Sequence, residues 1–193
     1  MSKKFSLQYV NEIVEKNNGK LLSKKYKNIK TRLNILCNVC SEKFKISLYK
    51  IKKGVWCPIC RLSKPQQLLY KIFKNIYPHY IIKTNYKKFS WLRGSSGKKQ
   101  ELDIFIYNKD KSFTCAIEYD GEQHFMPVKF GAKSDAEALM DLQKIQKMDI
   151  IKDRKIAKHS NDIKYFIRFN YKQNITQEFV CKVLQENRIP YAI

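Results

Sequence analysis

Hydrophobic residues recur along the chain with two different periods, and these periods predict helices and strands. Apolar positions three and four residues apart favour helices over residues 7–17, 66–76, 135–157 and 176–186. Alternating apolar and polar positions favour short strands over residues 30–36, 43–48, 80–86, 101–107, 113–120 and 164–169. A basic stretch rich in Gly and Ser, residues 91–99, is expected to form a loop.

The order of these elements predicts two domains. Residues 1–62 contain a helix and two strands, whereas the later residues run helix, three strands, helix, strand, helix. The second order is typical of an α/β layer with a mixed sheet. The Ser-Lys-Pro segment at residues 63–65 suits the first turn of a new helix, and acidic residues are concentrated after it. We therefore predict domains at residues 1–62 and 63–193.

The net charge is the strongest indication of a partner. Lys and Arg number 39 against 17 Asp and Glu, which gives a formal charge of +22. When such a surface neutralises DNA phosphates, it releases counterions and converts positive charge into affinity. A membrane surface would also attract it, but the sequence has no long apolar run and no start that resembles a signal peptide. We therefore expect an intracellular protein, of the cytoplasm or nucleus, that binds double-stranded DNA and no membrane.

Four of the six cysteines form two C-x2-C pairs, Cys37 with Cys40 and Cys57 with Cys60. In each pair the backbone turns two thiolates toward one ion, and two pairs complete a tetrahedral zinc shell. Four thiolates leave no position open for water, so this zinc would be structural. The alternative is four buried thiols, which requires two accidental pairs at this spacing. A reducing compartment and metal binding are favoured over disulfide bonds.

Basic and aromatic residues alternate around the cysteine pairs. Lys52 and Lys53 are the candidates for DNA contact, whereas Phe44 and Trp56 are expected to pack against the cysteine turns. The sequence of a helix, a C-x2-C pair, a strand and the segment Gly-Val-Trp-Cys-Pro resembles the zinc-ribbon or treble-clef fingers of viral, phage and mobile-element nucleases. This resemblance covers about the first third of the chain and implies a zinc module that contacts DNA.

The second domain carries acidic residues on two neighbouring strands. Because side chains on a strand alternate between faces, Glu101 and Asp103 are expected to project together, as are Glu118 and Asp120. If the strands form a hairpin, the carboxylates converge, and their repulsion favours a bound cation such as Mg²⁺. His124 would then be near enough to act as a general base or to assist the leaving group. A solvated strand face is the alternative explanation.

The segment Ile-Glu-Tyr-Asp-Gly at residues 117–121, with an Asp on the preceding strand and a His soon after, resembles a known nuclease superfamily. It is similar to the PD-(D/E)xK, or restriction-endonuclease-like, nucleases, in the branch of the very-short-patch-repair and related homing endonucleases. The resemblance spans about residues 63–172. It implies a mixed sheet flanked by helices and a catalytic Mg²⁺ or Mn²⁺ ion.

The same resemblance implies a role for each acidic residue of the two strands. Asp103 and Glu118 would bind Mg²⁺ together with the carbonyl oxygen of Tyr119. Asp120 would stand where most of the superfamily has a lysine, and His124 would be the base.

Further residues are expected to support the site or to hold DNA. By the resemblance, the catalytic set also includes Asp149 and Lys152, which would support the site or contact phosphate. Arg93, Lys98 and Lys99 lie in the loop before the first acidic strand, where they would either hold the DNA backbone over the site or simply be solvated.

Three functions remain open, in a definite order of preference. The first is a metal-dependent DNA endonuclease, of a virus or mobile element, in which a double-strand break would need a homodimer or two successive nicks. The second is a non-catalytic zinc-finger nucleic-acid-binding protein on a decayed nuclease scaffold. Gln66 and Gln67 favour it, because the family often has a glutamate at the start of this helix. The third is an RNA nuclease, because the acidic residues do not distinguish the two sugars.

Overall fold

The computed structural model describes residues 5–191. The chain divides into two compact units, the N-terminal and C-terminal units, which meet between Gln67 and Leu68. This division lies shortly after residue 62 and inside the helix α3 (Lys64–Ile76). Gln67 donates a hydrogen bond to the Leu62 carbonyl oxygen, and the Ser63 hydroxyl donates one to Gln66. The first turn of α3 is therefore held to the segment that precedes it.

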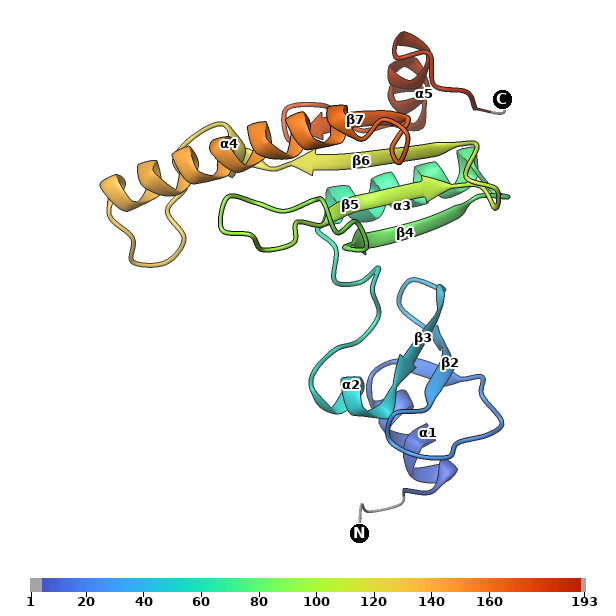
Figure 1. Cartoon of the computed structure of the whole chain (residues 1–193). Coiled ribbons are helices and arrows are strands. Elements are labelled where there is room, and N and C mark those ends of the chain that lie inside the picture. Colours follow the sequence, from blue (N-terminus) through green and yellow to red (C-terminus); the bar gives the residue numbers. More distant parts are fainter. Residues whose placement is uncertain (1–4, 192–193) are drawn as a thin grey trace. The chain divides into compact units, whose positions relative to one another are not determined.

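The N-terminal unit is built on a three-stranded antiparallel sheet with the strand order β1-β2-β3 (Figure 1). Its elements are α1 (Leu7–Lys16), β1 (Gly19–Leu21), β2 (Arg32–Cys37), β3 (Lys43–Ser47) and α2 (Leu48–Lys52). The helix α1 and the strands β2 and β3 confirm the sequence prediction. The sequence does not predict β1 or α2, because elements of three and five residues are too short to display a period.

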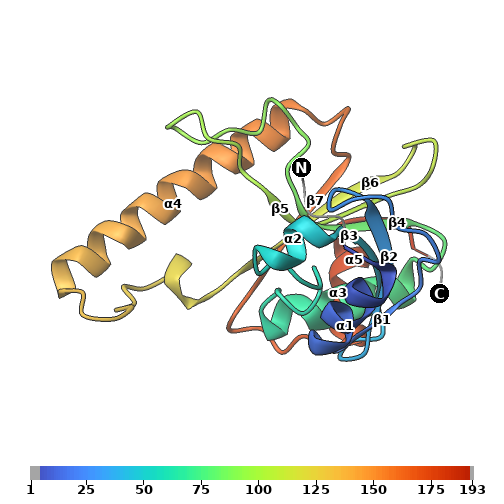
Figure 2. The same ribbon diagram turned by 90° about the horizontal axis from the view of Figure 1, so that it is seen from below.

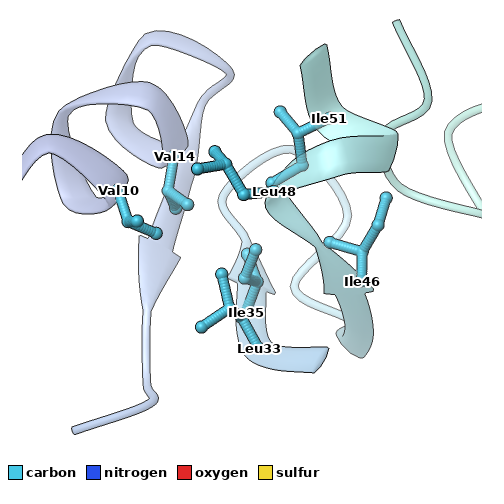
Figure 3. Close-up of a cluster of buried hydrophobic side chains, with 7 residues drawn as sticks. All are labelled: Val10, Val14, Leu33, Ile35, Ile46, Leu48 and Ile51. Carbon is cyan, nitrogen blue, oxygen red and sulfur yellow. The ribbon is translucent and has the colours of Figure 1, made fainter. Parts of the chain in front are cut away.

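A small apolar core fills one side of this sheet (Figure 3). Val10 and Val14 come from one face of α1, because residues four apart on a helix point the same way. Side chains from β2, β3 and α2 complete the core, whose buried members are Val10, Val14, Leu33, Ile35, Ile46, Leu48 and Ile51. Because these residues occupy alternate positions of β2 and β3, the remaining positions of both strands point to the opposite face of the sheet.

The C-terminal unit contains a four-stranded sheet with the strand order β4-β5-β6-β7. The pairs β4–β5 and β5–β6 are antiparallel and β6–β7 is parallel, so the sheet is mixed. The elements after α3 are β4 (Ile81–Tyr86), β5 (Leu102–Tyr107), β6 (Thr114–Asp120), the 3₁₀ turn η1 (Glu122–His124), α4 (Asp135–Lys158), β7 (Tyr165–Asn170) and α5 (Gln177–Glu186). The predicted α/β layer with a mixed sheet flanked by helices is confirmed.

Helices cover both faces of this sheet. Phe73 of α3 and Phe179 of α5 each contact Phe169 of β7, with ring centroids 6.2 Å apart. The helices α3 and α5 therefore lie on one face. On the other face, Ile156 of α4 belongs to an apolar cluster with Ala116 of β6. Both faces of the central strands are consequently buried.

The acidic residues of β6 lie on the face that α4 covers. Glu118 and Asp120 share this face with Ala116, and their exposed fractions are only 5% and 6%. A solvated strand face is therefore the wrong explanation for these two carboxylates. Their desolvation has to be offset by nearby cations and hydrogen-bond donors.

Only part of α4 lies on the sheet. The helix has 24 residues, which corresponds to about 36 Å. Lys152 and Ile156 of its C-terminal half are buried, whereas its N-terminal half runs past the strands (Figure 2) and exposes Leu139 and Met140. Among the described residues, no helix combines the length and apolar character needed to cross a membrane.

Candidate functional site

The four paired cysteines come together in the N-terminal unit. The Sγ atoms of Cys37 and Cys60 are 3.6 Å apart, and those of Cys40 and Cys57 are 3.4 Å apart. All four ligand atoms lie within 4.8 Å of one another. Around a tetrahedral zinc with Zn–S bonds of about 2.3 Å, thiolates stand about 3.8 Å from each other. The cluster therefore fits a metal ion such as zinc.

The thiols of this cluster differ in how readily they lose a proton. Burial raises the pKa of Cys57 to about 11, and it also raises the pKa of Cys60. Burial is the largest single effect on Cys37 and acts in the same direction, but hydrogen bonds from the amides of Cys40 and Val39 and from the thiols of Cys60 and Cys40 together lower its pKa. A metal ion would displace the protons of the thiols whose pKa is raised, so the affinity for the metal would depend on pH.

Aromatic packing supports the sheet beside the cysteines. The rings of Phe44 and Trp56 meet edge to face, with centroids 5.4 Å apart, and both pack against the apolar core. A Cβ atom built on Gly19 would lie 2.7 Å from the Trp56 ring, so only glycine leaves room for this ring. The structure thus gives Phe44 and Trp56 a packing role against the apolar core, whereas the sequence suggested packing against the cysteine turns.

The two lysines expected to contact DNA differ in their surroundings. The Lys52 ammonium lies over the ring of Phe5, 4.1 Å from its centroid, and 5.1 Å from that of Tyr9. Lys53 follows α2 and is exposed. Lys52 therefore already has an aromatic partner within the unit.

In the C-terminal unit, Asp103 of β5 and Glu118 of β6 are joined through the backbone of the two strands. The Tyr119 amide donates to Asp103 Oδ2 at 2.8 Å, and the Asp103 amide donates to Glu118 Oε1 at 3.3 Å. The two carboxylates are thus held on adjacent strands, as the hairpin predicts.

Glu118 is the most deeply buried acid of this group. Lys152 of α4 donates to Glu118 Oε2 at 2.6 Å and to the Glu101 carbonyl oxygen at 2.9 Å. Burial raises the pKa of Glu118 to about 7 and the Asp103 charge adds to this, while Lys152 acts in the opposite direction. A carboxyl group with a pKa near neutrality can hold or release a proton under ordinary conditions.

Asp120, at the end of β6, faces a guanidinium group from the neighbouring parallel strand. Arg168 of β7 donates to Asp120 Oδ1 at 2.6 Å and to Asp153 Oδ1 of α4 at 2.8 Å. Its Nη2 atom also lies 3.5 Å from Asp149 Oδ1. The pKa of Arg168 is raised, because these carboxylates outweigh the effect of burial, so the guanidinium remains charged.

His124, in η1, lies at the same place. Its Nδ1 atom is 2.7 Å from Asp149 Oδ2 and 3.6 Å from Asp120 Oδ1. The hydrogen bond to Asp149 raises the pKa of His124 above its ordinary value, against a smaller effect of burial. The turn at Gly121 and the C-terminal half of α4 therefore bring the histidine and its carboxylate partner together.

All six residues predicted as catalytic thus fall in one cluster between the sheet and α4, but two sets of metal ligands are open. The resemblance stated from the sequence implies Asp103, Glu118 and the Tyr119 carbonyl oxygen. In the structure, both oxygens of Glu118 accept hydrogen bonds from protein groups. A second set, Asp120, His124 and Asp149, has ligand atoms within 4.8 Å of one another and could also hold an ion.

The remaining predicted residues lie around the cluster rather than in it. Glu101 precedes β5 and pairs with Lys87 at 2.9 Å, so its carboxylate does not join Asp103 as its strand position suggested. Arg93 donates to the carbonyl oxygens of Ser90 and Gly97 and thereby holds its own loop together. Lys98 and Lys99 of that loop are exposed.

Sequence reasoning did not assign a role to Arg168 or Asp153. Both belong to the segments that carry the resemblance, but neither a lone arginine in a strand nor an acid near the end of a basic helix marks a site. The structure reveals their role because β7 lies parallel to β6, with Glu118 opposite Arg168. Paired residues share a face, so the arginine must meet the acids of β6.

No protein-family model matches this sequence, and no curated protein or solved structure is significantly similar to it. The fold and the clusters define an α/β protein with a mixed sheet, a four-cysteine group that fits a metal such as zinc, and a second acidic group with a histidine.

Proposed function

We propose that this protein is a metal-dependent DNA endonuclease of the restriction-endonuclease-like kind. The observation that carries the proposal is the convergence of six side chains in a chain whose formal charge is +22. The proposed catalytic residues are Asp103, Glu118, Asp120, His124, Asp149 and Lys152. An acidic, largely buried cluster in so basic a protein suits a site where a polyanion is held and a cation is needed for chemistry.

The charge of the cluster supports a bound divalent cation. Two permanent cations face five carboxylates, namely Lys152 and Arg168 against Asp103, Glu118, Asp120, Asp149 and Asp153. The all-oxygen set predicted from the sequence suits Mg²⁺, whereas the set with His124 also suits Mn²⁺. When bound, such an ion would polarise the scissile phosphate.

His124 is the proposed general base. With its Nδ1–H donated to Asp149, the Nε2 atom is free to take a proton from the attacking water. Asp149 would fix the tautomer and the orientation of the ring. If Nδ1 instead bound the metal, Nε2 would carry the proton of the neutral ring and could not act as a base. The two roles of His124 therefore exclude one another.

Lys152 and Arg168 are proposed to stabilise the negative charge that develops on the phosphate. Both are held by carboxylates of the cluster, at 2.6 Å from Glu118 and 2.6 Å from Asp120 respectively. A cation that is already oriented needs little rearrangement when charge develops beside it. Lys98 and Lys99 would attract the DNA backbone, and the N-terminal unit, with structural zinc, would add to DNA affinity.

The test is cleavage of a supercoiled plasmid with Mg²⁺, Mn²⁺ or no added divalent ion. Asp103→Asn retains an oxygen that can accept from the Tyr119 amide, so it changes the charge without removing that hydrogen bond. We expect it to lower the cleavage rate by at least about 100-fold. Asp110→Asn, in the turn of the same hairpin, is the matched control and should cleave normally. Equal rates for the two variants would contradict the proposed site.

His124→Ala separates the two sets of ligands. If His124 is the base, Mn²⁺ should bind the variant normally by calorimetry while cleavage is lost. If His124 is a ligand, Mn²⁺ affinity should fall as well. Matched DNA and RNA duplexes in the same assay decide between a DNA and an RNA nuclease.

A non-catalytic DNA-binding protein is the second candidate function. Two observations favour it: Gln66 and Gln67 form hydrogen bonds at the start of α3, and both Glu118 oxygens are already paired. Tight DNA binding without cleavage of a mixture of long natural DNAs, in either metal, would favour this function over the endonuclease.

A further inference from the structure

One face of the sheet in the N-terminal unit is basic and faces away from the core. Cross-strand partners share a face, and the register aligns Lys20 with Leu36 and Leu36 with Lys43. The next row aligns Asn34 with Lys45, and the last aligns Arg32 with Ser47. We call this surface the basic sheet face, defined by Lys20, Arg32, Asn34, Lys43 and Lys45, all of which are exposed.

The charged residues of the basic sheet face all have the same sign. No outward position of β1, β2 or β3 carries an acidic residue, whereas four of these positions carry Lys or Arg. Lys43 and Lys45 are two residues apart on one strand, so their backbones are separated by about 7 Å. Like charges at this spacing repel each other, and an anionic partner would relieve the repulsion.

The scaffold beneath these side chains is well packed. Leu33, Ile35 and Ile46, at the alternate positions of the same strands, are buried at 0%, 0% and 5% exposure. Arg32 Nη2 donates to the carbonyl oxygen of Lys45 at 3.2 Å, which links the two strands across the face. The cations therefore stand on an ordered surface rather than on a loop, so less conformational entropy is lost when they bind a partner.

We propose that the basic sheet face is the surface through which the N-terminal unit binds the phosphate backbone of duplex DNA. This inference rests on the proposed DNA-directed function, and it locates DNA binding on β1–β3 rather than at Lys52 and Lys53. The partner is identified by charge complementarity: a row-like array of cations fits a polyanion with regularly repeated charges. Lys52, by contrast, lies over the rings of Phe5 and Tyr9.

The experiment compares two variants of the full-length protein that lose the same charge from the same unit. Lys43→Gln/Lys45→Gln alters the basic sheet face, and Lys50→Gln/Lys53→Gln alters one exposed lysine in α2 and one directly after it. Binding to a fluorescently labelled duplex of about 30 base pairs, long enough for several phosphate contacts, is measured by anisotropy from about 50 to 200 mM salt without added Mg²⁺. Circular dichroism and zinc content confirm that both variants are folded.

We expect the face variant to bind at least about 10-fold more weakly at about 150 mM salt, and its slope of log affinity against log salt to fall by about 1.8, because two phosphate contacts are lost. The control should retain the wild-type slope. Equal losses of affinity in both variants would overturn the proposal and indicate that only the total charge matters. Unchanged affinity of the face variant would also overturn it, because Lys43 and Lys45 would then make no contact with DNA. If wild-type protein neither binds nor cleaves DNA, the proposed function fails and this inference fails with it. If wild-type protein cleaves and the face variant binds normally, only this inference fails.

Discussion

The buried ion pair between Glu118 and Lys152 allows a quantitative test of how the proposed active site is held together. The two side chains are 7% and 11% exposed, and Nζ lies 2.6 Å from Oε2. Removing one partner of such a pair leaves an uncompensated buried charge, at a cost of about 3–5 kcal/mol. Here the remaining group keeps one hydrogen bond. Glu118 still accepts from the Asp103 amide, and Lys152 still donates to the Glu101 carbonyl oxygen. We therefore expect the lower limit, about 3 kcal/mol, for Glu118→Gln or Lys152→Met.

The double variant should be much less destabilised than the sum of the two single ones. With both charges gone, the remaining loss is the ordinary one of a hydrogen bond and some packing, about 1 kcal/mol. The coupling energy of the cycle would then be several kcal/mol in size, well above the scatter of independent sites. In Lys152→Met, Glu118 can also take up a proton. The destabilisation should shrink as the pH falls from about 8 to about 6. A carboxyl group whose pKa is raised in the folded protein lowers the free energy of unfolding as the pH rises, because the buried group then has to ionise.

The assay is urea unfolding without added divalent ions, followed by the fluorescence of Trp91. The chain has two tryptophans, and Trp56→Phe leaves only Trp91, which reports on the C-terminal unit. This indole donates to Asp162 at 2.8 Å and stacks on His159, so its emission should change on unfolding. A double variant as unstable as the sum of the single variants would refute the argument, because the two charges would then act independently.

Three further predictions concern other parts of the chain. If the four cysteines hold zinc, a strong chelator should unfold the N-terminal unit, seen as a change in Trp56 emission in a Trp91→Phe variant, while Trp91 emission in a Trp56→Phe variant stays unchanged; parallel changes in both would contradict independent units. Gly19→Ala should destabilise the N-terminal unit by about 1–3 kcal/mol in urea unfolding followed by Trp56 emission, with Trp91→Phe removing the second signal, because its Cβ would meet the Trp56 ring; an unchanged midpoint would show that the ring can move. In the metal-free protein, the pair of His124 with Asp149 stabilises the fold fully below the ordinary histidine pKa of about 6.5 and progressively less as the pH rises through the raised pKa. His124→Ala should flatten the dependence of the melting temperature on pH in that window, and a wild-type-like dependence would rule out this pair as its cause.

The sequence predicted the α-helices and strands of the C-terminal unit because each is long enough to repeat its period, but it did not predict the three-residue turn η1. It also predicted which acids would meet on the strands, since alternation and the hairpin determine that. It was wrong about Glu101, whose carboxylate pairs with Lys87 just before β5 begins. A strand boundary that differs by one residue is enough to remove a side chain from a shared face.

Contacts between segments that are distant in the sequence could not be predicted from the periodicity of apolar residues. Nothing in the sequence specifies that α4 covers the acidic face of β6, or that Arg168 joins Asp120 to Asp153. Both follow from the parallel pairing of β7 with β6, which is a tertiary choice. The cysteine pairs are the opposite case, because local turns at a short spacing nearly determine the cluster on their own.

The position of α4 has a consequence for when the proposed site exists at all. Asp149, Lys152 and Asp153 come from little more than one turn of this helix, while their partners come from β6, β7 and η1. Because the N-terminal half of α4 packs little against the sheet, the helix can detach by local unfolding at a lower free energy than the whole unit. Each such opening separates all the pairs that these three residues form, whereas the pair of Arg168 with Asp120 joins β7 to β6 and does not depend on α4. The sheet would stay folded while the proposed site came apart. Amide hydrogen exchange along α4 would therefore measure the fraction of molecules in which the proposed site is assembled.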